Sequence, residues 1–339
     1  MVKVSFVDLS ILGPDNSRAA ALEATLAAAT HADRIGAARY WFTEHHATSG
    51  FVSTSPAVLV AAASRVTSTI RLGSGAVLLN QHSPFLVAET FATLELLAPG
   101  RIDLGLGRAS GGALVDFALQ RNRSTPTRPD FSEQVGKIVA LQRNEFEPDD
   151  PLLLLPLPAP VIERPEVWIL GSSGSTAEIA ASKGLGYAFA AFINPAAAAP
   201  ALRSYRSRFV PASKGFASAQ AAIAINVVTA DNDADARRLA WTHKAGLARM
   251  TNGAPMKRMP TVDEAASILT DNQKDSPTTI VNGQWPTIFA GSVSTIAEQL
   301  EQIRESTGAS EVIVQDQIPV LLTRLRSHEL MMNAANQAG

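Results

Sequence analysis

The chain has 339 residues, of which 46% are hydrophobic and 18% are charged, so it can bury a large core and its composition argues against general disorder. Its net charge is −2, without a basic surplus, which argues against nucleic acid and anionic membranes as partners. It has no cysteine, which excludes disulfides, thiolate metal sites and a cysteine nucleophile.

We expect a cytoplasmic protein. The first ten residues, MVKVSFVDLS, follow a strand pattern rather than the pattern of a signal peptide. The apolar stretch PLLLLPLPAPVI is short and broken by proline, and no apolar run approaches the ~20 residues of a membrane span.

Strand-like and helix-like segments alternate along the chain. In order, the first four pairs are strand 4–8 with helix 18–35, strand 38–44 with helix 55–66, strand 70–79 with helix 83–98, and strand 101–107 with helix 130–143. The second and third helices begin with Ser55 and Ser83, each followed by a proline, which suits the first helical position. The remaining pairs are strand 166–171 with helix 175–183, strand 186–192 with helix 196–209, strand 221–230 with helix 233–250, and, after a further helix at 293–306, strand 311–316 with a helix from residue 320.

Eight strands, each followed by a helix, predict a single (β/α)8 TIM barrel over residues 1–339. The strands are continuous apolar runs, as expected of a parallel sheet that is covered on both sides. A doubly wound sheet is the alternative arrangement of the same units. Stretches near residues 108–128, 144–165 and 251–285 are interpreted as loop insertions.

Polar or glycine-rich stretches follow four consecutive strands. They are EHHATSG, NQHSP, GRASGG and GSSGST, in chain order. Because the catalytic residues of a TIM barrel lie where the strands end and the next loops begin, we expect these stretches to cluster at one face of the barrel.

The stretch after the fifth strand passes through small hydroxyl residues into a helix. Free N–H groups at the helix start, together with Ser172, Ser173, Ser175 and Thr176, would form a cradle for a phosphate group. An ordinary helix N-cap explains these residues equally well. Arg108 would lie at the mouth of the barrel, either as a phosphate ligand that offers two hydrogen bonds or as an ordinary surface arginine.

Glycines lie at the end of the fourth strand and within the third strand. The stretch GLGRASGG looks like a dinucleotide fingerprint, but its spacing is wrong and no helix clearly starts within it. Gly73 and Gly75 fall inside the third strand. They make room either for a flat ligand against the backbone or for tight packing inside the barrel.

Glu44, His45 and His46 follow the second strand directly. Neighbouring residues of an extended chain point to opposite faces, so the two histidines do not easily bind one metal ion together. His82 is the one other histidine expected on this face, which leaves too few ligands for a typical metal site. A histidine that hydrogen-bonds or exchanges protons beside an organic cofactor fits better, with the other histidine in a structural role.

These motifs resemble the bacterial-luciferase-like flavin monooxygenases. The resemblance rests on YWFTEHHATSG, IRLGSGAVLLNQHSPFLVAETFATLELLAPGRIDLGLGR and GSSGSTAEIAASKGLGYAFA, and on FAGSVSTIAEQL and GASEVIVQD near the end. It covers most of the chain apart from the stretches near 110–130, 144–165 and 251–285. Within the family the chain is most similar to small luciferase-like oxygenases, some of which tailor aromatic polyketides.

The resemblance implies a TIM barrel that binds reduced FMN from a separate flavin reductase and uses O2, through a flavin C4a-hydroperoxide, to oxygenate a bulky aromatic or polyketide-type substrate. It implies that His45 is the catalytic histidine. It implies two groups of cofactor-binding residues: phosphate ligands at Arg108, Ser172, Ser173 and Thr176, and a non-proline cis peptide between Gly75 and Ala76 beneath the flavin ring. Glu44, His46 and His82 are interpreted as supports or substrate contacts.

The sequence departs from the family at three places. Gly107 stands where luciferase has a cysteine, and Ser172 replaces a glutamate. Ala191 and Phe192 replace the Ser-His pair of many close relatives, which changes the substrate contacts that the family would supply.

Other functions fit the same motifs. A coenzyme F420-dependent oxidoreductase could use the same scaffold, as could a flavin-binding protein without catalysis, and a metal-dependent hydrolase is the remaining alternative. The apolar helices after the second and third strands predict either a homodimer, as in the family, or ordinary packing of helices on the barrel.

Overall fold

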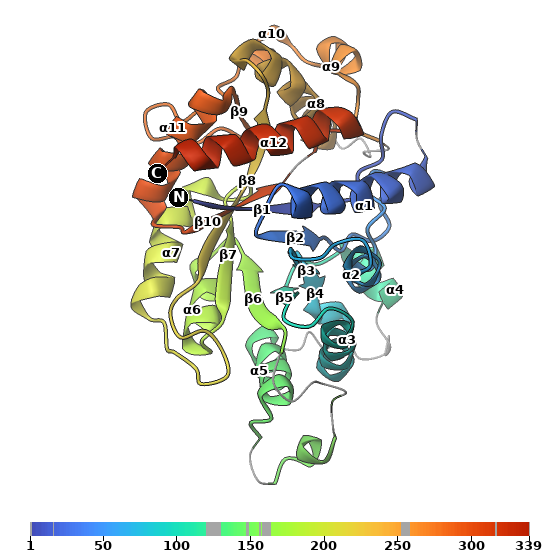
Figure 1. Cartoon of the computed structure of the whole chain (residues 1–339), viewed down its shortest axis with the longest axis vertical. Coiled ribbons are helices and arrows are strands. Elements are labelled where there is room, and N and C mark those ends of the chain that lie inside the picture. The colour runs from blue at the N-terminus through green and yellow to red at the C-terminus, as the bar shows by residue number, and fades with distance from the viewer. Residues whose placement is uncertain are drawn as a thin grey trace.

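Eight parallel strands close into a barrel in this computed structural model, which describes residues 2–15, 17–119, 130–146, 149–155, 157, 164–251, 258–315 and 317–338 (Figure 1). The barrel strands are β1 Lys3–Asp8, β2 Arg39–Phe42, β3 Arg71–Ser74, β5 Ile102–Gly107, β6 Glu166–Gly171, β7 Gly186–Ala190, β8 Ala221–Thr229 and β10 Glu311–Gln315. β10 pairs with both β8 and β1, which closes the ring. The predicted TIM barrel is confirmed, and the closure excludes an open, doubly wound sheet.

Helices cover the outside of the barrel (Figure 1). The longer ones are α1 Arg18–Arg34, α2 Pro56–Ser64, α3 Pro84–Leu97, α5 Phe131–Arg143, α6 Gly174–Ser182, α7 Ala198–Ser207, α8 Asp233–Thr251, α11 Val293–Thr307 and α12 Leu321–Gln337. The shorter ones are η1 Leu79–Gln81, α4 Ala113–Leu119, η2 Pro151–Leu154, η3 Pro195–Ala197, α9 Val262–Ile268 and α10 Asp271–Lys274. The last helix, α12, packs beside the first, α1, so the two ends of the chain meet on one side of the barrel.

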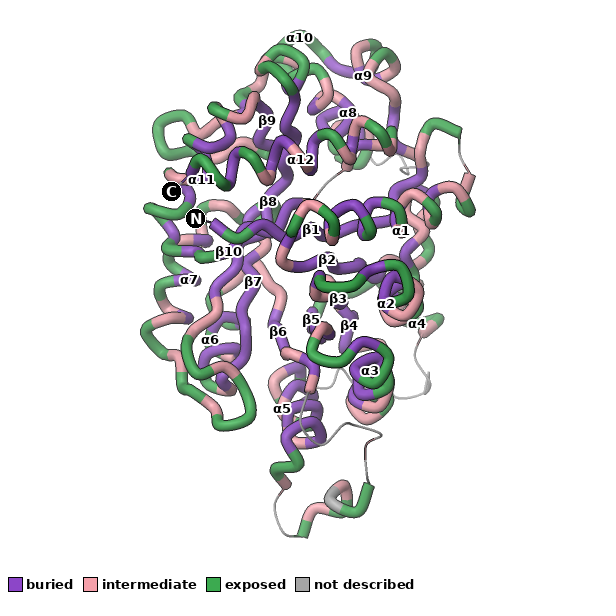
Figure 2. The backbone as a smooth tube through the Cα atoms, viewed as in Figure 1, coloured by how far each residue is buried: buried purple, intermediate pink, exposed green. Residues whose placement is uncertain are grey.

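Alternation along the strands divides the core into two layers. On β2, Trp41 points into the barrel, while Tyr40 and Phe42 point outward to the helices. The inner layer also holds Val7, Trp168, Ala188, Ala222, Ala224 and Ile313. The outer layer is the larger one, and Figure 2 shows that residues of the strands and of the inward sides of the helices are buried.

The third strand is split, although the sequence predicts one continuous strand over residues 70–79. β3 ends at Ser74, and β4 covers only Val77–Leu78. The peptide bond between Gly75 and Ala76 is cis, as the family resemblance implies. Both β3 and β4 pair with β5, so the barrel remains continuous across the break.

The stretch 251–285, which the sequence analysis interprets as a loop insertion, contains the helices α9 and α10. Each of these helices starts with a capping box, in which the threonine before the helix and the third helical residue bond each other's backbone, at Thr261 with Glu264 and at Thr270 with Gln273. A short strand that the sequence prediction lacks, β9 Phe289–Gly291, pairs with the end of β8.

The other two predicted insertions are described in part. Within 108–128, α4 forms a short helix, and within 144–165 the described residues include η2. Residues 120–129, 147–148, 156, 158–163 and 252–257 lie outside the described part of the chain. No helix among the described residues has the length and apolar character needed to cross a membrane.

Charged side chains fill the amino-terminal end of the barrel. Arg39, at the start of β2, forms ion pairs with Asp103 at 2.8 Å and with Glu166 and Glu311 at 3.0 Å. Burial acts to lower the pKa of Arg39, but the three carboxylates outweigh burial and hold its pKa above the ordinary value. The guanidinium carbon lies 4.5 Å from the ring centroid of Trp168. These side chains therefore fill the barrel interior at its amino-terminal end, and the space within the barrel lies toward the carboxyl ends of the strands.

Candidate active site

A cavity of about 460 Å³ lies at the carboxyl ends of the barrel strands. Its volume falls in the usual range of small-molecule sites. Val7, Trp41 and Ile313 line it with apolar side chains from the barrel interior, and Ala188 and Ala224 are small enough to leave space between them. Three of the four polar stretches that the sequence predicts to cluster contribute lining residues, after β2, β5 and β6, whereas NQHSP contributes none and the third strand borders the cavity through Gly75, Ala76 and Leu78.

His45 lines this cavity from the loop after β2. Its Nδ1 lies 2.9 Å from the Thr43 hydroxyl, and its ring packs 4.9 Å from the ring of Phe51. Burial lowers the pKa of His45 to about 4, and the neighbouring His46 adds to the effect. The imidazole is therefore neutral at pH 7, so one ring nitrogen carries a hydrogen and the other offers a lone pair.

Glu44 joins the two other predicted histidines behind the cavity wall. Its Oε1 accepts hydrogen bonds from Nε2 of His46 and Nε2 of His82, both at 2.7 Å, and its Oε2 accepts from the N–H of Leu78 at 2.9 Å. Burial acts to raise the pKa of Glu44, but the hydrogen bonds from His82 and His46 outweigh it and bring the pKa below the ordinary value. Glu44 borders the cavity, whereas His46 and His82 do not line it.

This arrangement differs from a metal centre. His46 and His82 direct their Nε2 atoms at the Glu44 carboxylate rather than at a shared open position. Across the described ranges, no group of three or more histidine, aspartate or glutamate side chains is placed to hold a metal ion.

The start of α6 also borders the cavity. Ser173 occupies the N-cap position, but its side chain makes no capping hydrogen bond. Thr176 is buried, and its hydroxyl donates to the carbonyl of Ser173 at 2.8 Å, while the Tyr187 hydroxyl donates to the same carbonyl at 2.9 Å. Ser172, Ser173 and Thr176 all line the cavity. The first N–H groups of α6 therefore lack a side-chain cap and are available to a ligand.

Arg108 lies at the mouth of the same cavity, directly after β5. Its backbone carbonyl accepts from the Asn80 side chain at 3.1 Å. Its side chain is exposed, and no ion pair joins it to any carboxylate of the described residues. The structure thus brings Arg108 together with Ser172, Ser173 and Thr176, as the sequence predicts.

The two glycines of the third strand have different roles. A side chain on Gly73 would lie 2.5 Å from the carbonyl oxygen of Asp103, so tight barrel packing explains this glycine. Gly75 and Ala76 line the cavity, where their small size leaves its wall flat. A side chain on Gly75 would also come within 2.9 Å of Val7.

Comparison with known proteins identifies the family. Residues 2–311 match the model of the luciferase-like monooxygenase family. The chain belongs to this family. The expectation that it is a monooxygenase enzyme of this kind is confirmed at the level of the family.

Full-length relatives support the assignment. A luciferase-like monooxygenase of Escherichia coli strain K12 is 32% identical over 337 residues, which cover 99% of this chain and 98% of that protein. The crystal structure of apo-MsnO8 is 34% identical, covers 99% of both chains and superposes with a TM-score of 0.88.

Two more distant structures share the fold alone. The FMN complex of the oxygenating constituent of 3,6-diketocamphane monooxygenase, from the CAM plasmid of Pseudomonas putida, is 19% identical over 98% of this chain and 97% of that one, with a TM-score of 0.70. An F420-dependent secondary alcohol dehydrogenase is 15% identical over 98% of both chains, with a TM-score of 0.65.

Several cavity residues of this luciferase-like monooxygenase are absent from the sequence prediction. They include Trp41 and Thr43 on and after β2, Ile193 after β7, and Gln315 at the end of β10. Each lies at or just after a strand end, which is the one signal that could have found them. Periodicity alone does not show which strand-end residues face inward.

Proposed function

We propose that this luciferase-like monooxygenase is the oxygenating component of a two-component system, which receives reduced FMN from a separate reductase. The observation that carries the proposal is that His45, the uncapped start of α6 and Arg108, which has no ion pair among the described residues, border one cavity. When bound, reduced FMN would supply the activation of O2. The protein's own residues would bind and orient the cofactor and control proton transfer beside it.

The residues present suit a flavin mononucleotide. The Arg108 guanidinium can give the phosphate a positive charge and two N–H donors. The free N–H groups at the start of α6 add further donors, at a helix end that favours negative charge. Ser172 and Ser173 contribute further polar groups beside this helix start. The flat wall at Gly75 and Ala76, joined by a cis peptide bond, suits a planar ring system.

His45 would act as a neutral hydrogen-bonding group or proton carrier at the wall of the cavity. Its pKa of about 4 keeps the imidazole uncharged at pH 7, so it can accept a proton from a group in the cavity or donate its one N–H. The Thr43 hydroxyl, 2.9 Å from Nδ1, fixes the orientation of the ring.

The lining of the cavity favours a bulky aromatic substrate. Trp41, Leu170 and Ile313 present apolar surface on the inside, and Phe192 and Ile193 lie at the edge with 37% and 64% of their surfaces exposed. Aromatic and aliphatic side chains bind an aromatic ring by burial and stacking. Such a lining also excludes water from the site, which suppresses wasteful side reactions of activated oxygen.

The alternative cofactor is coenzyme F420, because an F420-dependent dehydrogenase has the same fold. Anaerobic titration of the purified protein with reduced FMN and with reduced F420 distinguishes the two. Tight binding of F420 without binding of FMNH2 would contradict our proposal.

The decisive experiment is stopped-flow oxidation of the FMNH2 complex, with and without candidate aromatic substrates. We expect oxygenated product with little H2O2 from the unchanged protein. His45→Ala should divert oxygen to H2O2 and lower coupled oxygenation by roughly 100-fold or more. His31→Gln, on α1 away from the cavity, is the matched control and should remain coupled. Flavin binding without accelerated oxygen chemistry, across a broad substrate panel, would indicate a non-catalytic flavin-binding protein.

We also propose that the protein forms a homodimer and is cytoplasmic. Val58 on α2 and Leu86, Leu96 and Leu97 on α3 are exposed, with between 45% and 65% of their surfaces accessible. Neighbouring exposed apolar side chains on two adjacent helices suit an interface with a second copy. Light scattering at micromolar concentration should give twice the monomer mass, and a monomer would contradict this part.

A further inference from the structure

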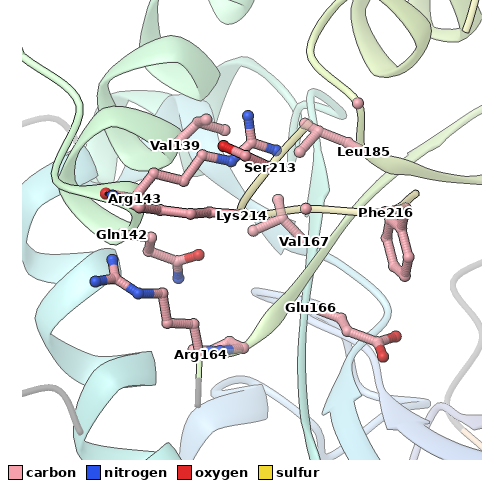
Figure 3. Close-up of a pocket in the computed structure, with 13 residues that line it drawn as sticks. Val139, Gln142, Arg143, Arg164, Glu166, Val167, Leu185, Ser213, Lys214 and Phe216 are labelled. Atoms are coloured by element: carbon pink, nitrogen blue, oxygen red, sulfur yellow. The ribbon is translucent and has the colours of Figure 1, made fainter. Parts of the chain in front are cut away.

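A second cavity, of about 390 Å³, lies at the amino ends of barrel strands, whereas the candidate active site lies at their carboxyl ends. Figure 3 shows the residues that line it. It is bordered by the last turn of α5, by residues 164–167 at the start of β6, by residues 184–185 before β7 and by the loop 213–216 after α7. All the strands that contribute do so at their amino ends. None of the predicted cofactor or histidine residues contributes to this cavity.

Three cationic side chains border this second cavity. They are Arg143 from α5, Arg164 just before β6 and Lys214 from the loop after α7. Arg143 is buried, and its Nη2 donates to the carbonyl of Lys183 at 3.0 Å; Lys214 in turn donates to the carbonyl of Arg143. Neither bond is to a carboxylate. Among the described residues, no salt bridge within 4 Å neutralises any of the three cations.

Among the residues that the structure describes, the carboxylates near these cations are either paired with other cations or lie outside the cavity. Glu166 borders the cavity, but its two oxygens pair with Arg39 at 3.0 Å and with Arg71 at 3.4 Å, on the barrel side. Glu145 is exposed and acts only to raise the pKa of Arg143, against the larger lowering by burial. The described lining of the cavity therefore carries an excess of positive charge, which attracts an anion.

Gln142 supplies the second, independent sign of a ligand. This residue is only 5% exposed, and its side-chain Nε2 is buried without a hydrogen-bond partner. Figure 3 shows its amide turned toward the space that Arg164 and Glu166 border. A buried amide donor normally has a partner, so a ligand oxygen at this position would complete its hydrogen bonding.

The remaining wall of the cavity is apolar. Val139, Val167 and Leu185 are buried side chains along it, and Phe216 closes it while packing edge-on against Trp168 at 5.5 Å. An inorganic ion would leave this surface unused. A ligand with an apolar body and an anionic group would contact both parts.

We propose that the second cavity binds a small organic anion, with its carboxylate or phosphate group held by Arg164, Lys214 and the Gln142 amide, and its apolar body against Val167 and Phe216. Arg164, Lys214 and the Gln142 amide are all donors, so the anionic group of the ligand must carry acceptor oxygens. Carboxylates and phosphate monoesters both do so. This proposal does not depend on the cofactor or substrate of the candidate active site.

The test is calorimetric titration of the full-length protein with four probes. Benzoate and phenyl phosphate carry both the charge and the ring, benzyl alcohol carries only the ring, and inorganic phosphate carries only the charge. We expect one or both aromatic anions to bind at least about tenfold more tightly than either partial probe. The stronger of the two aromatic anions shows whether the natural ligand is a carboxylate or a phosphate ester. Failure of both to bind at millimolar concentration would overturn the proposal.

Substitutions show in which of the two cavities the probe binds. Arg164→Gln and Gln142→Leu should each weaken the aromatic anion by at least about tenfold, whereas Arg164→Lys should retain most of the affinity. Arg108→Gln, at the candidate active site, is the matched control and should leave this affinity unchanged. If Arg108→Gln abolished binding and the Arg164 and Gln142 variants did not, the probe would lie in the other cavity and the proposal would be wrong.

A folding measurement separates binding from a structural role. Gln142→Leu removes a buried amide that has no partner, so the thermal midpoint without ligand should stay the same or rise. The same variant should lose the rise in midpoint that the aromatic anion gives to the unchanged protein. A lower midpoint with unchanged probe affinity would mean that Gln142 is structural, which contradicts the proposal.

Discussion

Glu44 and His82 are joined by a 2.7 Å hydrogen bond, which ties the loop after β2 to the segment after β4. The two residues are 38 positions apart in the sequence. His46, from the same loop as Glu44, donates to the same carboxylate oxygen. This carboxylate thus fixes the loop that carries His45, so Glu44 positions the candidate catalytic residue.

Glu44→Gln should therefore destabilise the protein. A glutamine keeps one acceptor but loses the charge that strengthens the bonds from His46 and His82. Loss of charge-assisted bonds in a buried site should lower the free energy of unfolding by about 1–3 kcal/mol. Urea unfolding monitored by circular dichroism measures this change.

Glu178→Gln is the matched control for this substitution. Glu178 pairs with Arg208 on the surface, where both side chains are more than 60% exposed. An exposed pair contributes little, so the change should stay within about 0.5 kcal/mol. Equal effects of the two substitutions would show that the Glu44 network contributes nothing beyond a surface pair.

The low pKa of His45 predicts a loss of stability in mild acid. Its folded pKa, about 4, lies below the ordinary 6.5, so the unfolded chain binds the proton first as the pH falls. Stability is therefore complete above about pH 6.5 and is lost as the pH falls toward 4. The part due to His45 between pH 7.5 and pH 5 is at most about 2 kcal/mol.

His45→Gln removes this titration. Its free energy of unfolding should fall less between pH 7.5 and pH 5 than that of the unchanged protein. Parallel pH profiles for the two proteins would show that His45 is not held neutral by burial.

The barrel was predictable because each unit carries strong local signals. The barrel strands are apolar runs of four to nine residues, and two helices start with serine–proline, at Ser55 and Ser83. Such patterns can be recognised without knowing the rest of the chain. β9 has only three residues, so it shows no periodicity of its own. It forms because β8 continues past Asn226, where its pairing with β10 ends.

The sequence predicted which residues lie at the candidate site, but not which of their side chains contact one another. Strand ends brought His45, Arg108 and Ser173 to one face, since a parallel barrel places all its carboxyl ends together. The bond from His82 to Glu44 depends on how two loops pack, which no local pattern encodes. The capping boxes at Thr261 and Thr270 were readable signals, and they would have predicted α9 and α10.

Arg108→Gln should weaken FMN by about 10- to 100-fold, because a charged, bidentate phosphate contact is lost. Riboflavin has the same ring system without the phosphate, so its affinity should be the same for the variant and the unchanged protein. Equilibrium titration followed by flavin fluorescence measures both ligands. An equal loss for riboflavin would place Arg108 beside the ring rather than the phosphate.

Gly105→Ala should destabilise the barrel by about 3 kcal/mol or more. The Ser74 hydroxyl bonds the N–H and carbonyl of Gly105 at 3.0 and 2.9 Å, and a side chain on Gly105 would lie 2.0 Å from the Ser74 carbonyl oxygen. Backbone on neighbouring strands cannot move aside without breaking the pairing, so the clash exceeds ordinary overpacking. Gly136→Ala, inside α5 and facing only the flexible end of Lys183 at 3.4 Å, should instead stabilise by up to about 1 kcal/mol. Urea unfolding should give opposite signs for the two substitutions, and the same sign for both would contradict this reading of the barrel contact.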